Sequence, residues 1–467
     1  MSYDQKSAVT SERRHLRTVL LIATVTAVGG FLFGFDNGAI SGSVGNLTTR
    51  FNLSPAGIGW VTSSIIVGCI IGVIISGRLS DAIGRKKVLV GTAIIFIVGA
   101  AAEALSPSAG ALVAARILVG VGIGMETTVA PLYIAEVAPA NIRGRLVSFN
   151  QLFNTIGNLV VFALAAVLTA VGSEAWSVNQ SWRWIFAAGI LPAIVFLALL
   201  PLIPESPRWL VRKGRVDIAR SVLNRINPSE EVADEQLRAM QLEAEDEGAA
   251  NWRTVLAPTM RKTLAIGFGC ALFQQITGIN AIFYYAPEIF KSAGLSVDAS
   301  MLSTVATGGA LVVGTLLAMW LVDRLGRRTL LIAGAALMAV FHVAIGILFM
   351  SPEGYGLLLL ALVIGYVLAF ATTFGAVAYV VISEIFPTNV RGVAVSISTF
   401  ALWGGNFLVS QFFPILVASV GTSVTFFIFA GTSLLALAFS ITMVPETKGR
   451  SLEEIQARIH GVGVVPK

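Results

Sequence analysis

Three side-chain amides lie close together in the segment QQITGIN, at Gln274, Gln275 and Asn280, within an apolar stretch of the chain. An amide offers both a hydrogen-bond donor and an acceptor, and so suits hydroxyl groups, which also offer both. A carboxylate or phosphate ligand would instead call for arginine or lysine. The amides therefore predict a binding site for a neutral, hydroxyl-rich molecule. The alternative is that they only hydrogen-bond neighbouring helices inside a membrane.

A single straight helix cannot point all three amides into one narrow cleft. At about 100° per residue, Gln275 and Asn280 would point about 140° apart, and Gln274 and Asn280 about 120° apart. Gly278 lies between them, and we expect the helix to bend or unwind there. Irregular backbone at membrane depth is tolerated only where it is buried in protein or lines a water-filled cavity. We therefore interpret this segment as the wall of a cavity.

Ionisable side chains inside apolar segments are the second set of candidates, because a charge is costly to bury in a bilayer. Asp36 lies in the first apolar segment and Arg116 in the fourth. At about 1.5 Å of rise per residue and a core about 30 Å thick, both fall in the outer third, so we expect them to meet. They predict either a structural ion pair or a proton site, since burial favours a neutral carboxyl group and a guanidinium favours a charged one.

Glu126, in the segment GIGMETTVAP, is a third ionisable side chain in an apolar stretch. Three interpretations of it stay open. It is a second proton site, a polar contact to the substrate, or the partner of an arginine near the cytoplasmic side.

The composition places these residues in a membrane protein. The chain has 467 residues, of which 55% are hydrophobic and only 12% charged, whereas a soluble chain carries about 25% charged residues. Apolar segments of about 20 residues recur, each long enough to cross a bilayer as a helix. We predict an all-α membrane protein with twelve transmembrane helices. The formal charge of +6 reflects basic residues on cytoplasmic loops, so no nucleic-acid partner is expected.

Three pairs of similar segments indicate a six-plus-six duplication. GRLSDAIGRKK, EVAPANIRGRLVS and PESPRWL follow the second, fourth and sixth spans, and VDRLGRR, EIFPTNVRGVAVS and PETKGRS follow the eighth, tenth and twelfth. Lysine and arginine gather on this side, so the positive-inside rule places both termini in the cytoplasm of a multi-pass cell-membrane protein. The predicted parts are a cytoplasmic N-terminus (1–18), a six-helix bundle (19–203), a cytoplasmic helical linker (204–261), a second bundle (262–444) and a cytoplasmic tail (445–467).

The chain from about residue 29 to residue 452 resembles the sugar porter family of the major facilitator superfamily. GGFLFGFDNGAISG, GRLSDAIGRKK, PESPRWL, FQQITGINAIFYYAP and PETKG carry the resemblance, and their combination is specific. The resemblance implies two six-helix bundles with a substrate site at mid-membrane between them, worked by alternating access. It also implies that proton-coupled members have an aspartate at the position of Asp36.

The resemblance further implies roles for particular side chains. The substrate-binding residues would be Gln151, Gln274, Gln275, Asn280, Trp403, Tyr379, Asn406 and Phe33. Trp403 would lie against the apolar face of the sugar, or else be an ordinary core aromatic. Tyr284 and Tyr285 would form the outer gate, or else an aromatic belt at the membrane interface.

The sequence departs from the family pattern in its C-terminal half. Leu311 and Leu402 stand where many members have amides, and Ala376 and Tyr379 replace the Pro and Trp of a GPxxW pattern. These changes leave the identity of the sugar open.

The repeated charged segments predict salt bridges between the bundles at the inner face, and the resemblance implies that these bridges favour the outward-open state. Exposed pairs contribute only about 0–1 kcal/mol each, so a network is needed. The alternative is that these charges only set the orientation in the membrane. The residues are Asp81, Arg85, Glu136, Arg143, Glu205, Asp323, Arg327, Glu384, Arg391 and Glu446.

The predicted function is import of a neutral monosaccharide or polyol, coupled to proton symport. An uncoupled facilitator is the alternative, and a transporter-like sugar sensor is a less favoured one. HExxH, GxSxG and Walker motifs are absent from the sequence, and the three histidines are scattered, so we expect no enzyme, no metal site and no cofactor. The expected partners are the sugar or polyol, protons and the lipid bilayer, and the protein is expected to be a monomer.

Overall fold

Helices make up all the regular structure in the part of the chain that the computed structural model describes. Backbone is described for residues 3–138, 143–227, 229–245, 255–351, 355–387, 390–450 and 452–460, and no strand occurs in these ranges. The all-α prediction is thereby confirmed.

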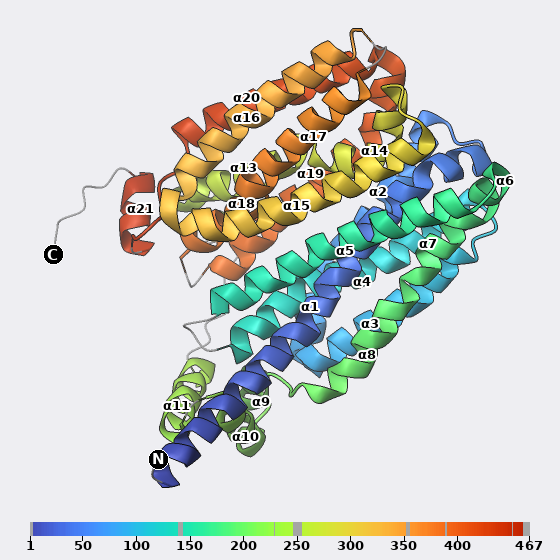
Figure 1. The fold of residues 1–467 in the computed structure, drawn as a ribbon. Helices are drawn as coiled ribbons and strands as arrows, with labels where there is room; N and C mark the ends of the chain where they lie inside the picture. Colours follow the sequence, from blue (N-terminus) through green and yellow to red (C-terminus); the bar gives the residue numbers. More distant parts are fainter. Residues whose placement is uncertain are drawn as a thin grey trace. The chain divides into compact units, whose positions relative to one another are not determined.

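The helices follow one another along the chain as labelled in Figure 1. The α-helices are α1 (Tyr3–Phe51), α2 (Pro55–Ile83), α3 (Arg85–Ala104), α4 (Ala109–Val137), α5 (Arg143–Val171), α6 (Glu174–Trp176), α7 (Trp182–Ala188), α8 (Ile190–Leu199), α9 (Pro207–Arg212), α10 (Val216–Ile226), α11 (Glu230–Glu245), α13 (Arg261–Ile276), α14 (Ile279–Ser292), α15 (Val297–Leu325), α16 (Arg327–Leu348), α17 (Gly356–Phe370), α18 (Ala376–Ile385), α19 (Arg391–Val420), α20 (Thr422–Thr442) and α21 (Leu452–His460). The other helical segments are the π-helical η1 (Ser177–Ser181) and η4 (Ala371–Gly375) and the 3-10 helical η2 (Leu200–Leu202) and η3 (Pro258–Met260).

Twelve helices among the described residues are long and apolar enough to cross a membrane, counting joined helices as one. Six of them lie within 18–202 and six within 258–442, which confirms the predicted number. The stretch that separates the two sets contains the short helices α9, α10 and α11.

Two sharp turns occupy equivalent places in the two halves of the sequence. Gly84 joins α2 to α3 with φ +98°, and Gly326 joins α15 to α16 with φ +85°. A side chain at either position would be strained, because L-residues rarely adopt positive φ. A Cβ on Gly84 would also lie 2.3 Å from Glu205, and one on Gly326 would lie 2.5 Å from Glu446. The glycines therefore let a carboxylate approach the start of the next helix.

The chain divides into two compact units, each of which combines several stretches of sequence. In the first unit α3 packs along α4 and α8, and in the second α13 packs along α19, α16 along α20 and α15 along α17. The first unit consists of Met1–Asp36, Val67–Gly157 and Phe186–Gly248, and the second of Asn37–Ile66, Asn158–Ile185 and Ala249–Lys467.

Candidate functional site

The helix that carries the QQITGIN segment is broken at the expected glycine. Helix α13 ends at Ile276 and α14 begins at Ile279, and Gly278 between them adopts a left-handed φ of +93°. A Cβ on Gly278 would lie 2.9 Å from the ring of Phe429. Both the backbone angle and the close ring require glycine, so the predicted break is confirmed.

The backbone carbonyls freed by this break are bound by hydroxyl groups from neighbouring helices. Thr432 of α20 donates to the carbonyl of Ile276 at 3.0 Å, and Tyr366 of α17 donates to the carbonyl of Thr277 at 2.9 Å. Unpaired backbone groups at membrane depth cost several kcal/mol in hydrocarbon, so these two bonds stabilise the irregular segment.

The break brings the three amides into one hydrogen-bonded chain. Asn280 Nδ2 donates to Gln275 Oε1, and Gln275 Nε2 donates to Gln274 Oε1 at 3.1 Å. Gln274 Nε2 in turn donates to the carbonyl of Gly375 at 3.0 Å, in the π-helical segment η4. The amides bond one another, so a ligand hydroxyl that replaces one of these partners can find both a donor and an acceptor.

Helices α18 and α19 add aromatic and polar side chains beside the amide chain. Tyr379 is 47% exposed, and its hydroxyl hydrogen-bonds Gln274. Gly405 of α19 lies against Gln275, since a Cβ on this glycine would be 3.0 Å from the glutamine Cβ. Trp403 and Asn406, both buried, lie within one helical turn of that contact.

The other two expected binding residues belong to the first unit. Gln151 on α5 is exposed and Phe33 on α1 is half-buried. Their role in binding, like that of the residues in the second unit, stays a prediction.

The two tyrosines expected at the outer gate are buried side chains of α14. Tyr284 donates to Asn37 Oδ1 at 3.2 Å, and Tyr285 donates to the carbonyl of Ser410 at 2.8 Å. The ring of Tyr285 also stacks on Phe413, with centroids 5.1 Å apart. Exposed fractions of 2% and 3% disfavour the alternative of an aromatic belt, whose rings lie at the lipid headgroups.

Asp36 and Arg116 meet as expected, and a second carboxylate joins them. Arg116 Nη2 lies 3.8 Å from Asp36 Oδ2, and Arg116 Nη1 lies 3.5 Å from Glu103 Oε1 on α3. The ring of Phe186 lies 5.9 Å from the guanidinium. Each pair attracts by about 4 kcal/mol at an effective dielectric constant near 20, while removing each ion from water costs several kcal/mol. The single positive charge of the guanidinium balances the charge of one carboxylate, not of two.

Glu126 is buried on α4 beside a side-chain amide. Asn150 Nδ2 lies 3.3 Å from Glu126 Oε1 and also donates to the carbonyl of Thr26 at 3.2 Å. Gly29 makes room for the carboxylate, since a Cβ there would lie 2.7 Å from Glu126 Oε1. The partner of Glu126 among the described contacts is Asn150. A proton site, a substrate contact and an arginine partner stay predictions.

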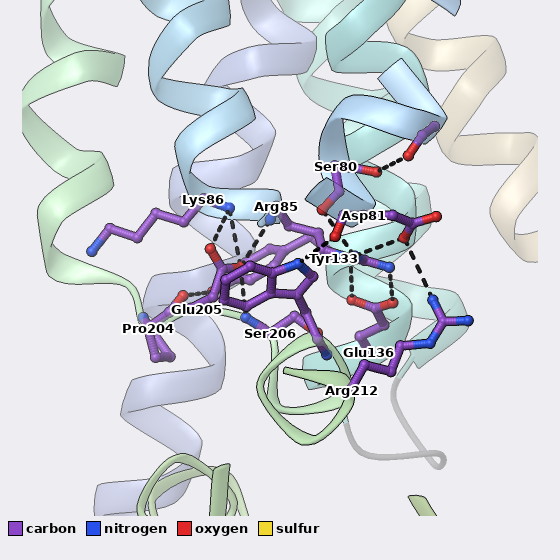
Figure 2. A network of polar contacts seen from close by, with 12 residues as sticks. Ser80, Asp81, Arg85, Lys86, Tyr133, Glu136, Pro204, Glu205, Ser206 and Arg212 are labelled. Carbon is purple, nitrogen blue, oxygen red and sulfur yellow. Dashed lines mark hydrogen bonds and ion pairs between the residues drawn. The ribbon is translucent and has the colours of Figure 1, made fainter. Parts of the chain in front are cut away.

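The charged segments of the first half form a connected network, shown in Figure 2. Arg85 makes two bonds to Glu136, at 2.9 and 3.0 Å, and lies 3.1 Å from Asp81. Glu205 accepts the backbone N–H groups of Arg85 and Lys86, at 2.9 and 3.2 Å. This carboxylate therefore caps the start of α3, where backbone N–H groups have no partner within the helix.

The second half repeats this arrangement with different residues. Arg327 lies 3.0 Å from Glu384 and 3.3 Å from Asp323. Glu446 accepts the backbone N–H groups of Arg327 and Arg328, at 2.9 and 3.1 Å, and so caps α16.

The contacts just described each lie within one half of the sequence, and pairing of these charges between the bundles stays a prediction. The reason for the pairing within each half is local: each aspartate lies four residues before its arginine, across the sharp glycine turn, and each capping glutamate follows the last span of its own half. Arg391 donates instead to the carbonyl of Phe386 at 3.2 Å. The side chain of Arg143 lies outside the described residues.

Comparison with known proteins identifies the family. Residues 22–458 match the family described as sugar (and other) transporter. The chain belongs to this family. It is 40% identical to the arabinose-proton symporter of Bacillus subtilis (strain 168), over 94% of each chain. It is 35% identical to the D-xylose-proton symporter of Escherichia coli (strain K12), over 94% of this chain and 95% of that one.

Solved structures of the family agree with this fold. A partially occluded, inward-open structure of the xylose transporter from E. coli matches with a TM-score of 0.83 and 34% identity, over 93% of this chain and 100% of that chain. The resemblance predicted from the sequence and the major facilitator fold are thereby confirmed. Because the family consists of transporters, the chain is a transporter and not an enzyme.

Sequence reasoning on this sugar transporter missed two polar side chains beside the candidate proton sites, Glu103 and Asn150. Glu103 carried a usable signal, since it is an acidic residue in the apolar segment GAAAEAL. Among the described residues, no group of three or more His, Cys, Asp or Glu side chains is arranged to hold a metal ion.

Proposed function

We propose that this protein imports a small neutral sugar or polyol together with a proton, by alternating access. The observation that carries the proposal is the chain of three amides at the broken helix, which ends on backbone carbonyls and contains no charged group. The amides of such a chain can exchange their bonds to one another for bonds to sugar hydroxyls. A charged substrate would find no group of opposite charge in the chain.

The relatives support this class of substrate. Their printed names include arabinose-proton and D-xylose-proton symporters, a probable polyol transporter of Arabidopsis thaliana and a major myo-inositol transporter of B. subtilis. All are named for small molecules rich in hydroxyl groups. Leu311 and Leu402 are buried where many family members have amides, so this protein would bind its sugar with fewer hydrogen bonds in the C-terminal half.

Proton coupling is proposed on the carboxylate of Asp36. This side chain is buried beside Arg116, and a change in their separation would change which charge state the carboxyl group prefers. Glu126 is the second candidate for the proton, since it is buried with an amide partner and no neighbouring cation is found among the described contacts.

The membrane arrangement that we propose follows the sequence. Residues 19–203 and 262–444 form the two bundles, 204–261 form a cytoplasmic linker, and both termini lie in the cytoplasm of a monomer in the cell-membrane bilayer. Tyr284 and Tyr285 close the outer side of the substrate site. The charged networks around Arg85 and Arg327 stiffen the cytoplasmic end of each half, and their exposed pairs separate at little cost.

The test is uptake into proteoliposomes that contain the purified protein. A panel of labelled pentoses, hexoses and polyols is supplied with and without an inward proton gradient. We expect one or a few sugars to accumulate only with the gradient. Uptake that is the same with and without the gradient would indicate an uncoupled facilitator. Binding without any uptake would indicate a sensor.

A further inference from the structure

Arg116 faces two buried carboxylates, and a single guanidinium neutralises only one of them. The exposed fractions are 7% for Asp36, 1% for Glu103 and 0% for Arg116. With both carboxylates ionised, the three side chains carry a net charge of −1 away from water, which is costly. One bound proton makes the group neutral.

In the part of the chain that the structure describes, no second cation acts on these two carboxylates. Helices α1, α3 and α4 supply the three charged side chains, and Phe186 of α7 covers the guanidinium. Among the described residues, the other titratable group that interacts with this site is the thiol of Cys69 on α2. A neutral thiol cannot balance the extra negative charge, so a proton on a carboxylate is the remaining means.

The guanidinium makes no short ionic hydrogen bond to either carboxylate. Its distances of 3.8 Å to Asp36 and 3.5 Å to Glu103 exceed the roughly 2.7–2.9 Å of a strong charge-assisted bond. Asp36 Oδ2 and the Nε and Nη2 atoms of Arg116 are buried without a hydrogen-bond partner. Glu103 is held near Arg116 because α3 packs along α4, whereas Asp36 comes from α1.

We propose that Glu103 competes with Asp36 for Arg116, so that the three side chains together bind the single proton that drives transport. When Arg116 turns to Glu103, Asp36 takes a proton from the outer solution and the group becomes neutral. When Arg116 turns to Asp36, that carboxyl group releases the proton to water on the inner side. The inference rests on the proposed symport and adds Glu103 to it as a positioning residue.

The test is the dependence of coupled transport on outer pH in Glu103→Gln. Glutamine keeps the size and hydrogen-bonding capacity of the side chain but leaves Arg116 to Asp36 alone. The charged form of Asp36 is then favoured, and a higher proton concentration is needed to load it. We expect the pH of half-maximal sugar-driven proton uptake to fall by roughly 1–3 units, the usual effect of an adjacent opposite charge.

Two further variants separate this effect from a structural one. Glu103→Asp keeps the carboxylate and should keep the wild-type profile within a small shift. Glu288→Gln is the matched control, because Glu288 pairs with Lys291 at 3.2 Å and has no contact with Arg116; its profile should equal that of the wild type. Exchange of labelled sugar without a proton gradient shows that each variant is folded.

The outcomes distinguish this inference from the symport itself. A wild-type protein that moves no protons refutes the symport. A coupled wild type with an unchanged profile in Glu103→Gln refutes the role of Glu103 and leaves the symport standing. An equal acid shift in Glu103→Asp also contradicts the inference, since that variant retains the competing charge.

Discussion

At the scale of single residues, the broken helix turns three amides that would point apart into one connected chain. Gln275 is its centre, because it accepts from Asn280 and donates to Gln274. A ligand that enters this chain must exchange bonds with Gln275 on at least one side. Removing the Gln275 side chain would therefore break both amide–amide bonds, whereas removing Asn280 or Gln274 would break only one of them.

Gln275→Ala is therefore expected to remove most sugar binding. A buried hydroxyl without its partner costs about 1–3 kcal/mol, or roughly 5- to 150-fold in affinity. Isothermal titration of the purified protein measures the change. Asn227→Ala is the control, since Asn227 is also a buried amide bonded to another amide, Gln236, but lies outside the proposed site. Equal affinity in Gln275→Ala and the wild type would exclude this binding site.

At the scale of elements, two kinds of joint connect consecutive helices. One is the break at Gly278, which separates α13 from α14. The other is the carboxylate cap at a helix start, where Glu205 binds the first residues of α3 and Glu446 binds the first residues of α16. The first joint positions the amides, and the second fixes where a helix begins after a sharp turn.

Gly278→Ala is expected to destabilise the protein and to weaken sugar binding together. The left-handed backbone costs a non-glycine residue about 1–2 kcal/mol, and the new Cβ would press on the ring of Phe429. Gly309→Ala is the control, because nothing lies within 4 Å of its Cβ position and alanine is the better helix former. Thermal unfolding in detergent and binding titration measure both effects. A stable Gly278→Ala protein with normal affinity would show that the break does not position the site.

Glu446 gives the second joint a dependence on pH. Burial raises the pKa of this carboxyl group, but four backbone N–H donors outweigh burial and hold the pKa below its ordinary value of about 4.5. Because the pKa is lower in the folded protein, the contribution to stability is present above the unfolded value and is lost as pH falls through the folded value.

Glu446→Gln should therefore unfold at a lower temperature than the wild type at neutral pH, with a difference that shrinks below about pH 4.5. Thermal unfolding followed by tryptophan fluorescence across this range is the measurement. Glu235→Gln, which changes an exposed glutamate of α11, should behave as the wild type throughout. A difference in unfolding temperature that is constant with pH would show that Glu446 does not act through its charge.

At the scale of the whole molecule, transport requires that proton and sugar move in the same cycle. Asp36→Asn removes the titratable group and keeps its size. The variant should bind and exchange sugar but should not accumulate it against a gradient, and sugar entry should no longer acidify the vesicle lumen. Pyranine fluorescence inside proteoliposomes reports the acidification.

The same assay on Glu126→Gln and on the double variant assigns the proton. If Asp36→Asn still concentrates sugar while Glu126→Gln does not, Glu126 is the coupling carboxylate. Loss of coupling in Asp36→Asn alone supports the proposed assignment.

The sequence predicted the features that depend on residue type and local spacing. Twelve spans followed from apolar length, the broken helix from a glycine between misaligned amides, and the Asp36–Arg116 contact from depth along two helices. Glu103 could not be paired in advance, because its position relative to Arg116 depends on how α3 packs along α4. The partners of the cytoplasmic charges could not be predicted for a similar reason, since repeated motifs do not state whether they bond within or between halves.

The two carboxylate caps also order events while the protein is being made. The N–H group of Arg85 bonds Glu205, which is synthesised 120 residues later. The N–H group of Arg327 bonds Glu446, which is synthesised 119 residues later. A growing chain folds from its N-terminal part first. The first cap can therefore close while the ribosome is still translating the second half, whose own cap forms only after Glu446 has emerged.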